Sequence, residues 1–442
     1  MISNYIKLAL RVLGRKKFFT AIMLFGISFT LAILMLIVSF LETELGNTAP
    51  IMDKDELVVM PMLTMQRQHF DTIYTIDTSI LDGVMVLDSS FKTESRGRSM
   101  SRSEYSLDFL EEYFSEIPSA ENFSFFNASA SFNSFVNNTK VEIEAAYTDH
   151  RFWEIMDFVF LEGSGFVKEI VDQQEQVAVL TDELAERYFG RQSGVLGEEV
   201  YMDGKNFKVI GLIKEPGLSL LSSDMFVPSS IMTKEERGDE EGFGGFIGVF
   251  EAAKASDVDN LKADIAFQNS QIPIPPGSYY NEIITEHHTY FEAYAQSLLY
   301  FEESDKSLRI MTIVLLSVLA LFILLPTLNL INLNVSRIME RSSEIGVRKA
   351  FGASQGTILQ QFVFENVVQT VLGGLIGLIL AIILINIIND SRLLGNVILK
   401  MNFRFFFFSF LICIAFGIVS GILPAYRMSR IHVVNALKQN QL

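Results

Sequence analysis

Four long apolar runs, separated by polar stretches of unequal length, dominate the chain of 442 residues. They cover residues 18–41, 310–333, 359–388 and 403–426, and the first two contain no charged side chain. A helix that crosses a bilayer needs about 20 predominantly apolar residues. Each run therefore predicts one transmembrane span, and an even number of spans places both ends of the chain on the same side of the membrane.

The first run is expected to be a permanent span and not a cleaved signal peptide. A signal peptide has a shorter apolar core followed by small residues at its cleavage site, whereas this run continues as Glu42-Thr43-Glu44. Before it, residues 1–17 alternate apolar with basic side chains. That pattern is typical of an amphipathic helix on the membrane surface, where it anchors the chain or contacts a partner subunit.

The long polar stretch after the first span, residues 42–286, predicts a folded α+β domain with room for two subdomains. The composition of four segments is typical of strands, which we expect at residues 57–62, 140–146, 177–180 and 246–250. Residues 198–211 indicate a hairpin that turns at Asp203-Gly204. Helical periodicity is found at residues 104–116, 182–189 and 255–267.

Residues 287–309 connect this domain to the second span and favour a helix. Tyr290, Tyr294, Leu298 and Phe301 are spaced to share one helix face. A helix that continues into the membrane would act as a stalk, because it carries a displacement along its length at 1.5 Å per residue. The alternative, a helix that packs under its own domain, fits the same pattern equally well.

Charge is distributed unevenly over these segments. The formal net charge is −17, but residues 42–307 hold 19 Lys and Arg against 48 Asp and Glu, a net −29, which leaves +12 for the remainder. Loops rich in lysine and arginine face the cytoplasm in multi-span proteins. Both termini, including the tail 427–442, are therefore predicted to be cytoplasmic. The acidic domain and the short loop 389–402 are predicted on the opposite side.

The loop between the second and third spans, residues 334–358, carries four cations and two anions. Glu344 and Arg348 are four residues apart, so on a helix they would pair with each other or with a partner protein. Gly346 and Gly352 would allow close packing or a turn. The pattern predicts a hinge-and-lever element against a cytoplasmic partner, with a charged surface loop that has no partner as the alternative.

Polar residues inside the apolar runs form a separate group. Pro326, Asn329 and Asn332 fall in the second run, and Glu365 falls near the start of the third. Such residues commonly make hydrogen bonds between helices and also mark functional positions in membrane proteins. We expect these four to lie at contacts between spans.

The motifs of nucleotide and metal chemistry are missing from the sequence. No GxxxxGK[ST] segment occurs, so the chain is not expected to hydrolyse ATP. Residues 242–248 are glycine-rich but lack the lysine, and we expect a flexible external loop there. Cys413 is the single cysteine and the five histidines show no metal-binding spacing, so neither a cofactor nor a metal is predicted for this chain.

Acidic pairs occur at Glu111-Glu112 and Glu198-Glu199, and residues 239–241 form an acidic run. Paired carboxylates can serve acid–base chemistry, but without a nucleophile or metal cluster beside them they indicate a solvated acidic surface. An external enzyme anchored by four spans is therefore disfavoured.

The segment Glu340-Arg-Ser-Ser-Glu-Ile-Gly-Val-Arg-Lys-Ala-Phe-Gly-Ala-Ser354 resembles the cytoplasmic signature of ABC-transporter permeases of the MacB/FtsX type, also called mechanotransmission or type VII transporters. The segments 152–163, 177–190 and 196–211 resemble the MacB periplasmic domain, and residues 421–437 are similar to the family's C-terminal ending. Two departures stand out: Ser164 replaces a common arginine, and residues 65–134 match nothing in the family pattern.

The resemblance implies a membrane protein built as an α-helical four-span bundle, with a large α+β periplasmic domain between spans one and two. Family members form permease dimers, from two copies or from two homologues, that bind a separate ATPase pair holding ATP and Mg²⁺. The implied ATPase-coupling residues of this chain are Glu340, Arg341, Glu344, Ile345, Gly346, Arg348, Lys349, Gly352 and Ser354. Other implied partners are membrane lipid, a periplasmic adaptor and an outer-membrane duct, but no nucleic acid.

The expected function is that of a permease subunit in the bacterial inner membrane. ATP hydrolysis by the partner would move the periplasmic domain and drive efflux of a substrate from the periplasmic side. Two alternatives stay open: an FtsX-like transducer that activates a periplasmic cell-wall hydrolase, and a lipoprotein-releasing permease like the LolC/LolE pair.

Overall fold

The computed structural model describes residues 17–81, 84–127, 130–136, 138–215, 223–239, 241–274, 276–299, 304–340, 347, 351–352, 354–391, 393–394 and 397–429. The chain divides into two compact units. One comprises Met1–Gly46 and Arg309–Leu442, and the other comprises Asn47–Leu308.

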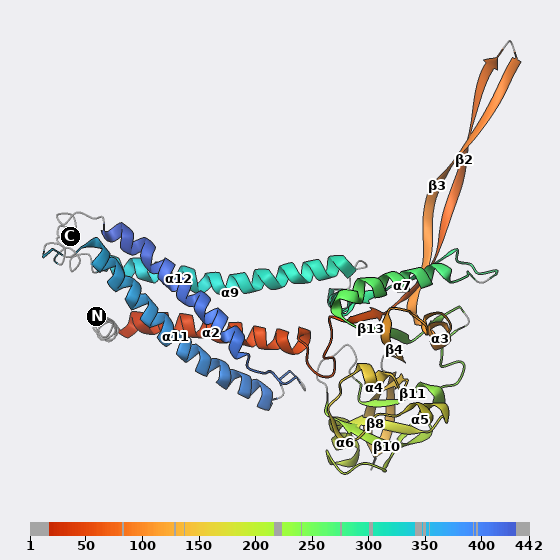
Figure 1. Cartoon of the computed structure of the whole chain (residues 1–442), viewed down its shortest axis with the longest axis horizontal. Coiled ribbons are helices and arrows are strands. Elements are labelled where there is room, and N and C mark those ends of the chain that lie inside the picture. Colours follow the sequence, from red (N-terminus) through yellow and green to blue (C-terminus); the bar gives the residue numbers. More distant parts are fainter. Residues whose placement is uncertain are drawn as a thin grey trace. The chain divides into compact units, whose positions relative to one another are not determined.

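The first unit is helical (Figure 1). Its long helices are α2 (Lys17–Leu45), α9 (Ser304–Glu340, which begins in the second unit), α11 (Gln355–Ser391) and α12 (Phe403–Ser429). Within the described residues, the segments Thr20–Leu45 and Gly356–Ser391 are long and apolar enough to cross a membrane, and Phe403–Ala415 is a shorter apolar helix. Four spans therefore stay a prediction.

Helix α11 packs against α2 through glycines. A Cβ atom on Gly373 would lie 2.8 Å from Ile27 Cγ2, and one on Gly377 would lie 3.0 Å from the Ser28 carbonyl oxygen. Gly374 faces α12 instead, where a Cβ would lie 2.2 Å from the Phe410 ring. The backbones approach closely because these side chains are missing, as is common between membrane helices.

The second unit is α+β, with strands that hydrogen-bond in the order β14-β2-β3-β13-β4-β6-β11-β8-β10-β7. The strands are β1 (Leu57–Met60), β2 (Leu63–Leu81), β3 (Val84–Tyr105), β4 (Ala120–Asn127), β5 (Ala130–Val136), β6 (Thr139–Thr148), β7 (Phe160–Gly163), β8 (Val177–Thr181), β9 (Glu199–Met202), β10 (Lys205–Ile213), β11 (Met225–Pro228), β12 (Phe243–Gly244), β13 (Phe246–Ala252), β14 (Glu282–Thr285) and β15 (His288–Thr289). The helices are α3 (Leu107–Phe114), α4 (Phe152–Ile155), α5 (Lys168–Asp172), α6 (Asp182–Phe189), α7 (Val258–Gln271) and α8 (Tyr290–Leu299), with 3-10 turns at Ser229–Ile231 and Ala255–Asp257.

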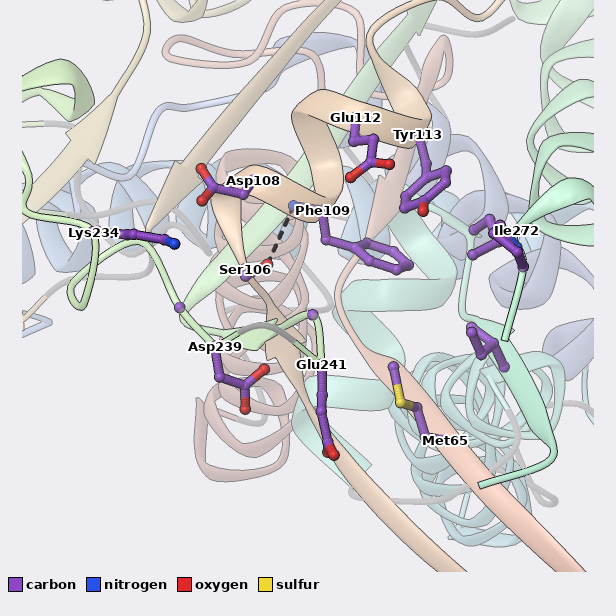
Figure 2. Close-up of a pocket in the computed structure, with 14 residues that line it drawn as sticks. Met65, Ser106, Asp108, Phe109, Glu112, Tyr113, Lys234, Asp239, Glu241 and Ile272 are labelled. Carbon is purple, nitrogen blue, oxygen red and sulfur yellow. Dashed lines mark hydrogen bonds between the residues drawn. The ribbon is translucent and has the colours of Figure 1, made fainter. Parts of the chain in front are cut away.

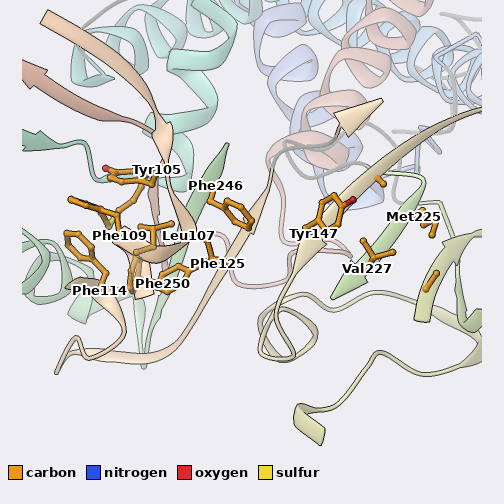
Figure 3. Close-up of a cluster of buried hydrophobic side chains, with 14 of the residues drawn as sticks. Tyr105, Leu107, Phe109, Phe114, Phe125, Tyr147, Met225, Val227, Phe246 and Phe250 are labelled. Carbon is orange, nitrogen blue, oxygen red and sulfur yellow. The ribbon is translucent and has the colours of Figure 1, made fainter. Parts of the chain in front are cut away.

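Two hydrophobic clusters form the core of this unit. One runs under α3 and α7, and Figure 3 shows part of it as two groups of side chains: Tyr105, Leu107, Phe109, Phe114, Phe125, Phe246 and Phe250, and then Tyr147, Met225 and Val227. The other is centred on Phe152 and Phe226, whose rings lie 5.5 Å apart and contact Trp153. The unit thus has the core of an independent domain.

Most of the local predictions for this unit are confirmed. The strands expected at 57–62, 140–146, 177–180 and 246–250 correspond to β1, β6, β8 and β13. The hairpin β9–β10 turns at Asp203 and Gly204, which have φ angles of 49° and 76°. Helix α6 has the expected bounds, and the third predicted helix is a 3-10 turn followed by α7.

One local prediction is wrong in its bounds, and a second is wrong altogether. The helix expected at 104–116 begins only at Leu107, because Ser106 caps it by accepting a hydrogen bond from Phe109 N, and Glu104 and Tyr105 end strand β3. Residues 242–248 do not form a flexible loop. Gly242 accepts a hydrogen bond from Ser106 N at 2.7 Å, and the following residues enter β12 and β13.

The largest element that was not predicted is a long hairpin made of β2 and β3, which we call the arm. Its strands pair from Leu63 with Ser103 to Leu81 with Val84, with one irregularity between His69 and Phe70. Figure 1 shows the two strands running side by side away from the rest of their unit. The arm accounts for much of the stretch 65–134 that the family pattern did not explain.

Candidate functional site

The predicted coupling segment falls between α9 and α11. Helix α9 ends at Glu340, and Ser354 caps α11 by accepting hydrogen bonds from Thr357 N at its side chain and from Ile358 N at its carbonyl. Gly352 has a φ of +87°, a conformation that favours glycine. The other coupling residues lie outside the described part: Arg341, Glu344, Ile345, Gly346, Arg348 and Lys349.

Two apolar side chains of this segment are exposed, and the sequence analysis missed both. Phe351 is 89% exposed and Val347 is 46% exposed, and Phe351 N donates a helical hydrogen bond to Val347 O at 3.1 Å. Residues four apart on a helical turn share one face. Val347 and Phe351 are thus two exposed apolar side chains in a segment whose sequence is rich in charged residues.

The predicted span contacts are only partly described. Helix α9 continues through Pro326, Asn329 and Asn332 without a break. Glu365 is buried, at 3% exposure, on α11 beside the buried polar residues Asn366, Gln369 and Thr370. Within the described residues the Gln369 amide has no hydrogen-bond partner. Whether these polar groups bond across helices stays a prediction.

The predicted stalk helix begins later than expected, because His288 and Thr289 form strand β15 against β1. Thr289 and Glu292 then make a reciprocal N-terminal cap: Thr289 N donates to Glu292 Oε2 at 2.7 Å, and Glu292 N donates to Thr289 Oγ1 at 3.3 Å. Tyr290 is buried in the second core cluster and Tyr294 packs beside it, so the start of α8 packs on its own domain. Leu298 is exposed, and Phe301 lies outside the described residues.

Glu215, which follows β10, is an unusual titratable group. Burial raises its pKa from about 4.5 to about 7; a hydrogen bond with Thr181 acts in the opposite direction, and the Asp224, Glu183 and Asp182 carboxylates add to the rise. Its Oε2 atom has no hydrogen-bond partner among the described residues. The native domain therefore holds this proton more tightly than the unfolded chain does.

This shift predicts that the free energy of unfolding falls as pH rises from about 4.5 to about 7. Above that range the Glu215 carboxyl is ionised in both the native and the unfolded chain, so it adds no further pH dependence. Glu215→Gln should remove the dependence and raise the free energy of unfolding at pH 8 by on the order of 1 kcal/mol, allowing for solvent screening. Thermal unfolding at pH 5 and pH 8 measures the effect. The exposed Glu199→Gln is the control, and an equal gain at both pH values would contradict the prediction.

Comparison with protein families bears on most of the chain. The MacB-like periplasmic core domain matches residues 20–266, and the FtsX-like permease C-terminal domain matches residues 316–433. The chain belongs to the MacB/FtsX-type family of ABC-transporter permeases. The two matches lie on either side of α8 and the start of α9.

Individual relatives of this permease are distant. It is 26% identical over 290 residues to the pyoverdine export ATP-binding/permease protein PvdT of Pseudomonas syringae, and 28% identical over 286 residues to the macrolide export ATP-binding/permease protein MacB of Bdellovibrio bacteriovorus. These matches cover 65% and 62% of the chain but only 42% and 41% of the relatives. The permease YknZ of Bacillus subtilis is 26% identical, over 69% of the chain and 67% of the relative.

Two solved structures match part of the chain at low similarity. The periplasmic region of MacB from Actinobacillus actinomycetemcomitans covers 44% of this permease and 83% of its own chain, at 16% identity and a TM-score of 0.34. A domain of a putative permease from Porphyromonas gingivalis matches over 54% of this permease and 91% of its own chain, at 13% identity and a TM-score of 0.36.

Proposed function

We propose that the chain is the permease subunit of an ABC transporter whose separate ATPase pair moves the Asn47–Leu308 domain and so drives export of a substrate from the periplasmic side. In this proposal the chain has four spans, both termini lie in the cytoplasm, and ATP and Mg²⁺ are bound only by the ATPase. A second permease copy or homologue completes the membrane unit. A periplasmic adaptor and an outer-membrane duct are further proposed partners.

The observation that carries the proposal is the exposed Phe351 in a segment whose sequence resembles the family's ATPase-coupling signature. A phenylalanine that is 89% exposed in a short connection between two long helices gains free energy when a partner covers it. The names of the relatives PvdT and MacB add support, because each joins an ATP-binding part to a permease. This chain would obtain the ATP-binding part from another subunit.

Purification of the chain from its native membrane in mild detergent, followed by mass spectrometry of the stoichiometric partners, tests the proposal. A P-loop ATPase together with a periplasmic adaptor is the expected result. An ATPase with a cell-wall hydrolase would indicate the FtsX-like alternative, and an ATPase with lipoproteins would indicate the LolC/LolE-like alternative. Recovery without any ATPase would overturn the proposal.

A further inference from the structure

A cavity of about 270 Å³ lies where the arm joins its domain, and we call it the arm-root cavity. Its walls come from the base of β2, helix α3, the loop before β12, and the chain on either side of the turn that follows α7 (Figure 2). The lining residues are Met65, Ser106, Asp108, Phe109, Glu112, Tyr113, Lys234, Gly238, Asp239, Glu241, Gly242, Ile272, Pro273 and Ile283. The volume is close to the lower end of the range for small-molecule sites, about 300–1,000 Å³.

One part of the cavity is aromatic and aliphatic. The Phe109 and Tyr113 rings lie 5.0 Å apart, and Figure 2 shows both rings on the same side of the cavity as Ile272, with Met65 opposite. The Tyr113 phenol is neutral near pH 7, and burial and the neighbouring Glu112 raise its pKa further. Neutral aromatic rings attract cations through their faces and apolar groups through their area.

Carboxylate side chains from two distant segments line the same cavity, at opposite ends of it in Figure 2. Asp108 and Glu112 come from α3, whereas Asp239 and Glu241 come from the loop before β12. In the sequence both acidic segments fit a solvated surface, and only the fold places them along the same cavity. Like charges in one place raise each other's energy unless a cation compensates them.

Among the described residues, few basic side chains lie close enough to the cavity to offset its carboxylates. Lys234 is the one basic side chain in the lining. Arg237 lies nearby, but its guanidinium already pairs with Asp108 at 2.6 Å and with Glu111 at 2.5 Å. The lining therefore carries an excess of negative charge.

The walls are held in place before any ligand arrives. Leu107 N donates to Arg237 O, and Asp239 and Phe243 exchange two hydrogen bonds of 2.8 Å. Gly238, with a φ of +120°, lies so close to α3 that a Cβ would be 2.3 Å from Ser106 Cβ. A cavity that is already formed costs little ordering entropy when a ligand binds.

We propose that the arm-root cavity binds an organic cation with an aromatic or apolar body. The carboxylates would hold the positive group, and Phe109, Tyr113, Met65 and Ile272 would cover the body. A bare metal ion fits less well, because the described residues contain no group of three or more His, Cys, Asp or Glu side chains arranged to hold one. The identification of this cation as transported cargo rests on the proposed export function.

Binding of naphthylmethylammonium to the full chain in nanodiscs of zwitterionic lipid, measured by calorimetry with empty nanodiscs as the blank, tests the proposal. The neutral naphthylmethanol and the anionic naphthylacetate are matched controls for charge. The cation should bind about tenfold or more tightly than the alcohol, and the anion should not bind. Raised salt should weaken the binding, because the carboxylates are partly exposed.

Glu112→Gln combined with Glu241→Gln should weaken binding of the cation about tenfold. Both side chains are exposed, so the variant is expected to fold. Glu199→Gln removes an exposed carboxylate from β9, outside the lining, and should leave the affinity unchanged. Equal affinities for the cation and the alcohol, or equal losses in the double variant and the control, would overturn the site.

This result is independent of transport. If the cation binds as expected but no ATPase co-purifies, the site stands and the export function fails. If an ATPase with a periplasmic adaptor is recovered but the cation does not bind, the export function stands and the site fails.

Discussion

Gly377→Leu is expected to lower the free energy of unfolding of the helical unit by about 3 kcal/mol or more. At this position α11 lies so close to α2 that a Cβ would be 3.0 Å from the Ser28 carbonyl oxygen and 3.1 Å from Leu31 Cβ. A leucine side chain would force the helices apart, because a backbone atom cannot move aside as the end of a flexible side chain can. The contacts of Leu31 and its neighbours would be lost at the same time.

Thermal unfolding of the detergent-purified protein measures this loss. Gly356→Leu on the same helix is a matched control, because the nearest atom to its Cβ would be Ser354 Oγ at 3.8 Å. The control should unfold close to the unaltered protein. If both variants unfold alike, the close approach of α2 and α11 does not hold the unit together.

Phe351→Ala is expected to weaken binding of the partner ATPase about tenfold or more, because an exposed aromatic side chain that becomes buried at an interface is commonly one of its strongest contacts. The alanine removes the ring without touching either neighbouring helix. Titration of the reconstituted permease with its ATPase gives the affinity. Leu393→Ala is the control, since Leu393 is also exposed, at 74%, but lies in the loop after α11.

Glu344→Ala and Gly346→Leu test the same segment at a later step. Both should leave the complex assembled but reduce the stimulation of ATP hydrolysis by the permease about tenfold, the size of a typical coupling between two sites. The reduction would arise because the segment no longer transmits movement of the ATPase. Unchanged stimulation and transport in these two variants would exclude the hinge-and-lever interpretation.

For Phe351→Ala the contradicting outcome is different: an unchanged affinity for the ATPase would exclude Phe351 as part of the docking surface.

The sequence predicts those elements of the domain whose side chains pack into its core. Strand β8 is buried at every position and reads as an apolar run, while α6 begins at Thr181, whose side chain caps it by accepting from Leu184 N, and ends at Gly190 in a left-handed conformation. The capping residues and the apolar periodicity of α6 therefore indicate the same helix ends. The error at residues 104–116 has a specific cause, because Glu104 and Tyr105 fit a helical pattern but pair with β12 and β13 instead.

The arm escaped prediction because several of its described side chains beyond the base do not pack on a core. Ile73, Tyr74 and Phe91 are exposed, and the Tyr74 and Phe91 rings lie 6.5 Å apart. Without a buried face, the pattern of apolar positions carries little information about register. A usable signal was present nonetheless, since Asp82-Gly83 stands between two runs rich in β-branched and aromatic residues and is a preferred hairpin turn.

The arm-root cavity could not be predicted from sequence for a different reason. Residues near 110 and near 240 become neighbours through long-range contacts, among them the ion pair of Arg237 with Asp108 and the pairing of Gly244 with Glu104. No local pattern encodes such long-range pairings. In the coupling segment the charged residues could be recognised from the sequence alone. The exposure of Phe351 could not, because it depends on how the segment folds.

The pairing within the arm lets its length vary independently of the rest of the fold. Its strands pair with each other over nearly their whole length, and side chains alternate between faces every second residue. Removing or adding two residues on each strand would shorten or lengthen the hairpin by about 7 Å without changing which face any other side chain occupies. The length of the arm can therefore change without any change in the sequence of the membrane helices or of the domain core.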